Sequence, residues 1–250
     1  MPPNLLILAG TTEATAFARH AAELGLEGTV SFAGRVARPL RQPLPQRVGG
    51  FGGAEGLAAY LEEHQVTHLI DATHPFAEQM SRNAVIAAER AGVPLVALTR
   101  PPWTPEAGDD WVRVPDIAGA VAALDRPAAR VMLAVGRMHL AEFAPNPQHF
   151  YLLRLVDPPA VPPPFPDHHV IVDRGPFEAE ADRALMEAQG IELVVSKNAG
   201  GTGAYAKITA ARSLGLPVVM IDRPALPARR EVHDIEEALA WVHAGTDLGV

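Results

Sequence analysis

The chain has 250 residues, which is enough for one large domain or for two small ones. Its formal net charge of −8 gives no overall basic field for nucleic acid or for an anionic membrane, so anionic ligands would need a local group of basic side chains. Because the sequence contains no cysteine, disulfides, zinc–thiolate sites and iron–sulfur clusters are excluded.

Short apolar runs alternate with amphipathic helical stretches along the chain, which is typical of a parallel sheet covered by helices. In the first half, this pattern predicts strands at residues 5–9, 30–33, 68–72 and 95–99 and helices at residues 12–24, 54–64 and 76–91. In the second half, it predicts strands at residues 130–135, 151–156, 170–173, 193–196 and 218–221 and helices at residues 178–189 and 204–214.

The two halves also resemble each other in sequence. Residues 91–101 match residues 214–224, and each segment is followed by a valine-containing stretch and an Asp-Ile pair that opens an apolar helix. Junctions in which a helix passes through Gly-x-Pro into a strand recur in parallel α/β proteins. However, the matching features occur in the same order in both halves, which favours an internal duplication. We therefore predict two Rossmann-like α/β lobes with parallel sheets and a cleft between them, at residues 1–125 and 126–250, with the C-terminal helix free to pack on the first lobe.

The first expected strand leads into Gly10, Thr11, Thr12 and Glu13, where a dinucleotide-binding fold turns into its first helix. Glycine permits the close approach of a phosphate group, which amides, hydroxyls and the helix dipole attract. With one glycine, the loop is not the G-x-G-x-x-G fingerprint. A threonine N-cap with a glutamate in the first helical turn is the structural alternative, and it is compatible with phosphate binding.

The second expected strand contains Ser31 and leads into Gly34 and Arg35, where dinucleotide folds bind the adenosine ribose. An NAD site has an acidic residue there, whereas an arginine can bind a 2′-phosphate bidentately and a serine can add a hydrogen bond. We therefore expect residues 1–125 to bind NADP rather than NAD. The alternative is a solvated basic loop.

Thr73, His74 and Pro75 follow the third predicted strand, and the proline suits the first turn of the next helix. Ligands of open α/β sheets bind at the carboxyl ends of the strands. We therefore expect Thr73 and His74 to contact the nicotinamide end of the cofactor or the substrate. The alternative is a capping threonine beside a surface histidine.

Polar turns also follow strands of the second half, which we expect to form the substrate side of the protein. The glycine-rich segment at residues 196–203 combines backbone amides with a lysine, a combination that suits anionic oxygens, and Tyr205 and Lys207 lie on the next helix. The residues expected to bind an anionic substrate are Arg137, Arg174, Lys197, Asn198, Gly200, Gly201 and Tyr205.

The sequence predicts no metal site and no membrane segment. His168 and His169 are adjacent in an expected strand, so their side chains should point to opposite faces. The first residues lack the basic start and the long apolar run of a signal peptide. We therefore expect a cytoplasmic protein with a small-molecule partner, and neither nucleic acid nor a membrane as a partner.

Taken together, the motifs resemble the precorrin-6A reductase family of corrin-ring biosynthesis. The matching segments are residues 7–14, 34–35, 71–77, 100–103, 173–177 and 196–201, of which 73–77 and 196–198 are the most specific. The resemblance implies an oxidoreductase that transfers a hydride from NADPH to the conjugated macrocycle of precorrin-6A. The product would be precorrin-6B, an intermediate of cobalamin (vitamin B12) biosynthesis.

The resemblance also implies a tetrapyrrole substrate that carries many acetate and propionate carboxylates. Arg137, Arg174 and Lys197 would balance these charges. Reduction also requires a proton, for which His74, Asp173 and bound water remain open as sources.

Three other functions fit parts of the pattern. One is reduction of the cobalt-containing substrate of the anaerobic route by a closely similar enzyme. A second is a non-catalytic NADP-binding sensor, which would bind the cofactor without oxidising it. A third is a binding protein of two α/β lobes, which would not bind NADPH.

Overall fold

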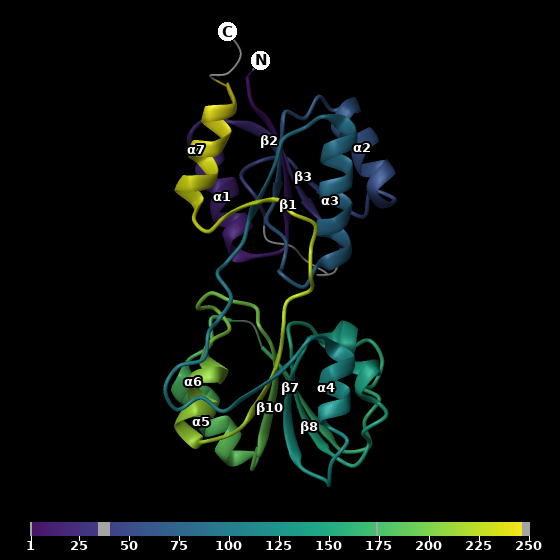
Figure 1. Ribbon diagram of the computed structural model, residues 1–250, viewed down its shortest axis with the longest axis vertical. Helices are drawn as coiled ribbons and strands as arrows, with labels where there is room; N and C mark the ends of the chain where they lie inside the picture. The colour runs from purple at the N-terminus through teal and green to yellow at the C-terminus, as the bar shows by residue number, and fades with distance from the viewer. Residues whose placement is uncertain (1, 35–40, 174, 247–250) are drawn as a thin grey trace. The chain divides into compact units, whose positions relative to one another are not determined.

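The computed structural model describes residues 2–34, 41–173 and 175–246, and these residues form two compact units. Unit 1 contains the chain up to Arg100 and the chain from Ala225 onward, whereas unit 2 contains Pro101–Pro224 (Figure 1). Each unit has a six-stranded sheet in which every paired strand is parallel to its neighbour. The predicted α/β fold with two parallel sheets is therefore confirmed.

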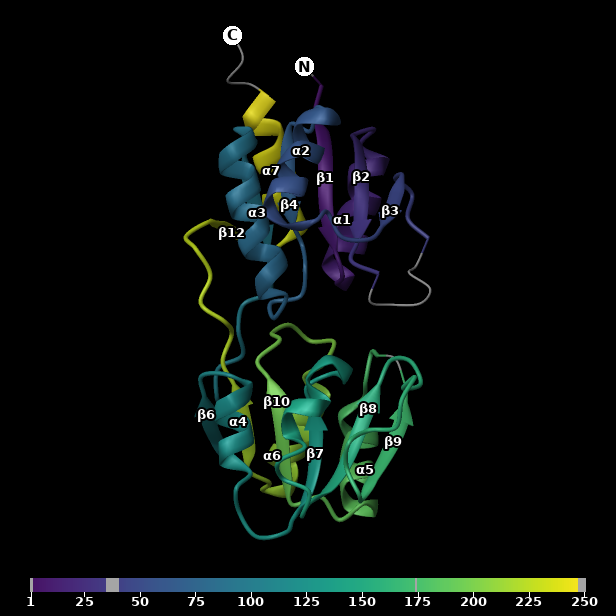
Figure 2. The ribbon, with the colours of Figure 1, turned by 90° about the vertical axis from the view of Figure 1, so that its right-hand side faces the viewer.

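The sheet of unit 1 has the strand order of a dinucleotide-binding fold. Its strands are β1 (Asn4–Ala9), β2 (Glu27–Phe32), β3 (Gln46–Val48), β4 (His68–Asp71), β5 (Leu95–Leu98) and β12 (Arg230–Val232). They pair in the order β12-β5-β4-β1-β2-β3 (Figure 2), in which the direction of chain progress reverses at β1. On one face lie α1 (Thr12–Glu23) and α7 (Ile235–Thr246), and on the other α2 (Gly53–Glu63) and α3 (Glu78–Ala91).

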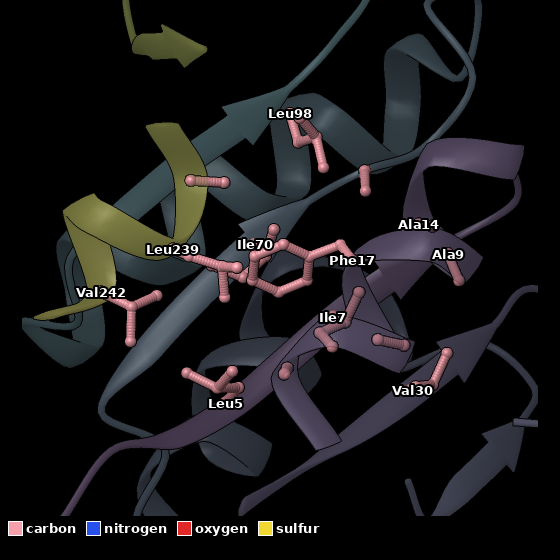
Figure 3. Close-up of a cluster of buried hydrophobic side chains, with 14 of the residues drawn as sticks. Leu5, Ile7, Ala9, Ala14, Phe17, Val30, Ile70, Leu98, Leu239 and Val242 are labelled. Carbon is pink, nitrogen blue, oxygen red and sulfur yellow. The ribbon is translucent and has the colours of Figure 1, made fainter. Parts of the chain in front are cut away.

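β1 is buried on both faces, because helices cover both sides of the sheet. Leu5 and Ile7 pack against the α1 and α7 side, where Figure 3 shows the ring of Phe17 beside Ile7. Leu6 and Leu8 pack against α2 and α3. This two-sided core holds β1 in place, and with it the loop that follows the strand.

The sheet of unit 2 repeats the order of unit 1 strand by strand. Its strands are β6 (Trp111–Val114), β7 (Arg130–Ala134), β8 (Phe150–Leu155), β9 (His168–Val172), β10 (Leu193–Lys197) and β11 (Val218–Ile221), in the order β6-β11-β10-β7-β8-β9. On one face lie α5 (Ala179–Ala188) and α6 (Ala206–Leu214), and on the other α4 (Ile117–Ala123), which contacts the 3₁₀ helix η1 (Arg137–Phe143).

Two strands are exchanged between the halves of the chain. β6 follows β5 in sequence but pairs with β11, and β12 follows β11 but pairs with β5. The division expected at residue 125 therefore differs from the structure, because hydrogen bonding joins residues 111–114 to the second sheet and residues 230–232 to the first. α7 contacts α1 and β5, so the C-terminal helix packs on unit 1.

The Asp-Ile pairs of the two repeats have the same structural role. Asp116 accepts a hydrogen bond from the backbone N–H of Gly119 at 2.8 Å and caps α4. Asp234 accepts one from the backbone N–H of Glu237 at 2.7 Å, at the start of α7. Both aspartates satisfy amides that the first helical turn leaves without an intrahelical partner.

The described helices include none that is both long enough and apolar enough to cross a membrane.

His68, the first residue of β4, is buried at 5% exposure, and its ring lies edge-on to Trp241 at 5.2 Å. Nδ1 is 2.9 Å from the Thr67 hydroxyl, and Nε2 has no hydrogen-bond partner among the described residues. Burial lowers the pKa of His68 below its usual 6.5, because the charged form loses its hydration.

We expect the free energy of unfolding to fall as the pH drops below about 6.5, because the unfolded chain then binds a proton that folded His68 resists. Phenylalanine keeps a ring against Trp241 but cannot titrate, so His68→Phe should flatten this part of the pH dependence. Urea unfolding between pH 5 and 8 measures the effect. Identical pH slopes in the two proteins would refute the assignment.

Candidate functional site

The N-terminus of α1 lies at the carboxyl edge of the unit 1 sheet, between the ends of β1 and β4. Thr11 caps the helix, since its hydroxyl oxygen accepts a hydrogen bond from the backbone N–H of Ala14 at 3.1 Å. The same hydroxyl donates to the carbonyl oxygen of Ala72 at 2.8 Å and so ties the loop to the end of β4. This position is the topological switch point, where open α/β sheets bind their ligands.

Gly10 leaves the approach to this helix end open. Its φ of +153° is a conformation that L side chains rarely adopt, and an added Cβ would meet nothing within 4 Å. Thr12 follows with its hydroxyl 3.1 Å from the Glu13 carboxylate. Open space, amides and the positive end of the helix dipole fit an anionic group such as a pyrophosphate.

Glu13 forms an ion pair with Arg100, with 2.9 Å between Arg100 Nε and Glu13 Oε1. Arg100 follows β5, so the pair lies at the same edge of the sheet. Without it, a carboxylate beside a phosphate would repel the ligand. Glu13 was predicted from the sequence to lie at this edge, whereas no role in the site was predicted for Arg100.

Arg47 lies beside Ser31 at the far end of the same edge. Its Nη1 donates to the buried Ser31 hydroxyl at 2.8 Å, and its guanidinium lies 3.9 Å from the centroid of the Phe51 ring. Sequence reasoning missed Arg47 because β3 has only three residues and no apolar run. Gly34 follows β2 with a φ of +75°, whereas the predicted cofactor residue Arg35 lies outside the described residues.

A buried carboxylate supports Thr73 at the end of β4. Asp71 is 2% exposed and accepts hydrogen bonds from the Thr73 hydroxyl at 2.7 Å and the Ser81 hydroxyl at 2.6 Å. Arg229 Nη1 lies 2.5 Å from the same carboxylate and forms a buried ion pair with it. Asp71 and Arg229 were both missed as site residues, and only the fold brings these two positions together.

His74 lies next to this cluster and accepts a hydrogen bond at Nδ1 from the backbone N–H of Phe76, at 3.2 Å. An imidazole that accepts at Nδ1 is neutral and carries its proton on Nε2. Pro75 is buried in the turn that follows, and α3 begins at Glu78. The hydrogen bond at Nδ1 therefore orients the His74 ring at the end of β4.

In unit 2, two of the residues predicted to bind substrate also make hydrogen bonds that support the fold. The side-chain amide of Asn198 accepts from the backbone N–H of Trp103 at 2.7 Å and donates to its carbonyl oxygen at 2.9 Å. The Tyr205 hydroxyl bonds Glu106 at 3.1 Å and Arg212 at 2.6 Å, and burial raises its pKa. Both side chains therefore form hydrogen bonds that hold the loop after Pro101 in place.

The glycines of this segment have a similar role. The carbonyl oxygen of Gly201 accepts from the Trp103 indole N–H at 2.7 Å, and both Gly200 and Gly201 have φ values near +70°, at +69° and +66°. Such φ values favour glycine for backbone reasons alone. The glycine-rich segment at residues 196–203 therefore contacts Trp103 and is also a candidate anion site.

Two of the three basic residues expected in unit 2, Arg137 and Lys197, lie at the carboxyl edge of its sheet. Lys197 is half-buried at the end of β10, and Arg137 is exposed at the start of η1. Asp173 is exposed after β9, whereas Arg174 lies outside the described residues. Across the described ranges, no three His, Asp or Glu side chains are grouped so that they could hold a metal ion.

The two units differ at the helix that follows their first strand. Gly136 occupies the place in unit 2 that Gly10 has in unit 1, and it also has a positive φ, of +78°. However, η1 replaces the regular helix α1, so unit 2 lacks the long aligned helix whose N-terminus attracts a pyrophosphate. The dinucleotide geometry is therefore confined to unit 1 within the described chain.

The family model for precorrin-6x reductase CbiJ/CobK matches residues 4–243. The chain belongs to this family. A precorrin-6A reductase of Rhodobacter capsulatus is 54% identical over 249 residues, which is 99% of each chain. A cobalt-precorrin-6A reductase of Priestia megaterium is 29% identical over 255 residues, with 96% of this chain and 97% of the relative covered.

A solved precorrin-6A reductase structure shares the fold. It superimposes with a TM-score of 0.93 at 54% identity and covers 97% of each chain. Since the match of the precorrin-6x reductase model runs through both units, the family resemblance includes the exchanged strands β6 and β12 as well as the two loops at residues 10–13 and 73–75.

Proposed function

We propose that this chain reduces precorrin-6A to precorrin-6B in cobalamin biosynthesis, with NADPH as the reductant. The observation that carries the cofactor assignment is the open N-terminus of α1, with Gly10 at the switch point of the unit 1 sheet. Membership of the precorrin-6x reductase family supports the substrate. The higher identity to a precorrin-6A reductase than to a cobalt-precorrin-6A reductase favours the metal-free substrate.

The residues of unit 1 suit the successive parts of NADPH. Gly10, Thr11 and Thr12 would hold the pyrophosphate by backbone amide donors, with Glu13 neutralised by Arg100. Ser31, Gly34 and the arginines at positions 35 and 47 would bind the adenosine end. Bound NADPH supplies the hydride that the reaction needs.

Thr73, His74 and Pro75 would position the nicotinamide end. Asp71 holds the Thr73 hydroxyl, and Arg229 neutralises Asp71, so the end of β4 is fixed before any ligand binds. His74 would donate its Nε2 proton to a ligand oxygen as a hydrogen bond. The proton that completes the reduction would then come from Asp173 or from water.

Replacing His74 by alanine should weaken ligand binding about 3- to 10-fold, which corresponds to one lost neutral hydrogen bond. The pH profile of single-turnover NADPH oxidation should not change, because His74 is not expected to act as an acid. Asp173→Asn in the same assay tests the other candidate. Loss of the acidic limb of the profile in His74→Ala would contradict this role.

Arg35→Ala and Arg47→Met should each weaken NADPH binding by about 10- to 100-fold, the effect of losing a charged hydrogen bond to the 2′-phosphate. NADH, which lacks this phosphate, should bind almost as before. Equilibrium titration of both nucleotides measures the preference. Arg90→Met, at an exposed position on α3, is the control. An unchanged preference in either variant would remove that arginine from the phosphate site.

The activity itself is tested by following NADPH absorbance after the protein is mixed with precorrin-6A. Oxidation with the metal-free substrate is expected, and faster oxidation with cobalt-precorrin-6A would favour the anaerobic route. Binding of NADPH without oxidation by either tetrapyrrole would support a non-catalytic sensor. Failure to bind NADPH at all would refute the cofactor assignment.

A further inference from the structure

Unit 2 contains a cavity of about 140 Å³ that the predicted substrate residues do not explain. It lies where β7, β8, α5 and α6 meet, and Phe177 and Ala204 complete part of its wall. Its charged lining comes mainly from Arg154 on β8, Asp182 on α5 and Lys207 on α6. None of these three was predicted as a site residue.

Lys207 is a buried ammonium group with little neutralising charge around it. The residue is 8% exposed, and its Nζ donates to the carbonyl oxygen of Ala204 at 2.5 Å and lies 5.1 Å from the centroid of the Trp103 ring. A carbonyl and an aromatic face stabilise a cation but do not neutralise it, and an ammonium has three donors to satisfy. An unneutralised buried charge is costly.

The neighbouring charges do not supply the missing anion. Arg154 forms a buried ion pair with Asp182, with 2.5 Å between Arg154 Nη2 and Asp182 Oδ1, and its guanidinium lies 4.1 Å from the centroid of the Phe177 ring. Asp182 Oδ1 is therefore engaged by Arg154, whereas Asp182 Oδ2 has no hydrogen-bond partner among the described residues, so the carboxylate acts on Lys207 only through its charge. Asp173, which also lines the cavity, is exposed, so water screens its charge.

The surroundings of Lys207 lower the pKa of its ammonium group, as expected for a buried cation with little neutralising charge nearby. Burial, reinforced by the positive charge of Arg154 and opposed by Asp182, lowers the pKa of Lys207 to about 8. The amine is still largely protonated near neutral pH. A carboxylate that entered the cavity would stabilise the ammonium form, so each would favour the other.

Apolar side chains at the same edge of the sheet are exposed. Val156, which lines the cavity, is 50% exposed, and Met138, two residues after the lining residue Gly136, is 63% exposed. A ligand that fits this region needs an apolar surface for the exposed side chains and a carboxylate for Lys207. A tetrapyrrole has both, in its apolar macrocycle and its short carboxylate arms. The edge would contact the macrocycle while an arm entered the cavity.

We infer that this cavity is a subsite for one acetate or propionate arm of the substrate, whose carboxylate pairs with Lys207 and contacts Arg154. The inference rests on the proposed function for the identity of the substrate. Substrate recognition would then involve charged residues inside unit 2, in addition to Lys197 and Arg137 at the edge of its sheet.

The test compares Lys207→Met with Arg183→Met, which removes the same charge from a partly exposed position on α5. Methionine keeps most of the length of the lysine side chain and removes an unfavourable buried charge, so the variant should fold, as thermal unfolding will check. The probes are NADPH, precorrin-6A and uroporphyrin, a stable tetrapyrrole with eight carboxylates. Fluorescence titration measures uroporphyrin binding.

Lys207→Met should raise the Kd for uroporphyrin and the KM for precorrin-6A at least 10-fold. Its Kd for NADPH should not change, and Arg183→Met should stay within 2-fold of the wild type throughout. Wild-type affinity for uroporphyrin should also fall as the pH rises through about 8, where Lys207 loses its proton, and the variant should lack this step. Among the described residues that line the cavity, the charged groups facing Lys207 are Arg154, Asp182 and Asp173.

Unchanged binding of both tetrapyrroles in Lys207→Met would overturn the subsite, as would a wild-type protein that does not bind uroporphyrin. Loss of kcat at constant KM would also overturn it, because Lys207 would then act in the reaction and not in binding. If the wild type binds uroporphyrin through Lys207 but never oxidises NADPH with precorrin-6A, the subsite stands and the proposed function fails.

Discussion

Replacing Asp71 by alanine is expected to lower the free energy of unfolding by roughly 3–5 kcal/mol, the usual cost of breaking a buried ion pair. The variant would leave the Arg229 guanidinium, whose side chain is 7% exposed, without its carboxylate. It would also remove the acceptor of the Thr73 and Ser81 hydroxyls. Chemical denaturation measures the loss, and NADPH titration should show weaker binding because Thr73 is no longer held.

The control for this prediction is the exposed pair Arg82–Glu78, which has the same chemistry at consecutive turns of α3. Glu78→Gln should cost no more than about 0.5 kcal/mol, since water already screens the charges and the hydrogen bond from Arg82 to the carbonyl oxygen of Ala225 is kept. A double-mutant cycle with Asp71→Asn and Arg229→Met then isolates the pair. Additive effects, within about 0.5 kcal/mol, would show that the two residues do not depend on each other.

Gly10→Val should raise the Kd for NADPH by at least about 100-fold, which corresponds to roughly 2.7 kcal/mol. The new side chain would occupy the open space in front of α1, which is where the pyrophosphate is expected. It would also force a β-branched residue into a conformation that favours glycine, with a φ of +153°. Fluorescence titration of NADPH measures the affinity.

Gly136→Val is the matched control, because it places the same β-branched residue at a glycine of positive φ in the corresponding position of unit 2. Its Kd for NADPH should remain at the wild-type value, whereas tetrapyrrole binding should weaken, since Gly136 lines the cavity of that unit. Equal losses of NADPH affinity in both variants would indicate general damage. No loss in Gly10→Val would remove the loop from the cofactor site.

The central strands could be predicted from the sequence because they are buried on both faces. A strand such as β1 appears as an uninterrupted apolar run, which any parallel sheet requires. The edge strands β3, β6 and β12 have three or four residues and are partly exposed, so no such run marks them. The sequence repeat identified equivalent segments, but only hydrogen bonding between strands determines to which sheet each belongs.

The candidate site was predictable where it lies within one loop and not where it depends on contacts distant in sequence. Thr11 and Thr73 follow strands and were identified by that position. Arg229 reaches Asp71 across 158 positions of the chain, and no local pattern connects them. Asn198 was predicted to bind a ligand from its position at a strand end, but that position did not reveal that its side chain also bonds the backbone of Trp103.

The strand exchange affects the order in which the protein can fold during synthesis. Unit 2 is continuous in sequence, so all of its strands have been translated once Pro224 has been added. Unit 1 begins with the first residues of the chain, but its edge strand β12 and covering helix α7 come last. Unit 1, which contains the candidate cofactor site, is therefore begun before unit 2 and completed only after the whole of unit 2 has been made.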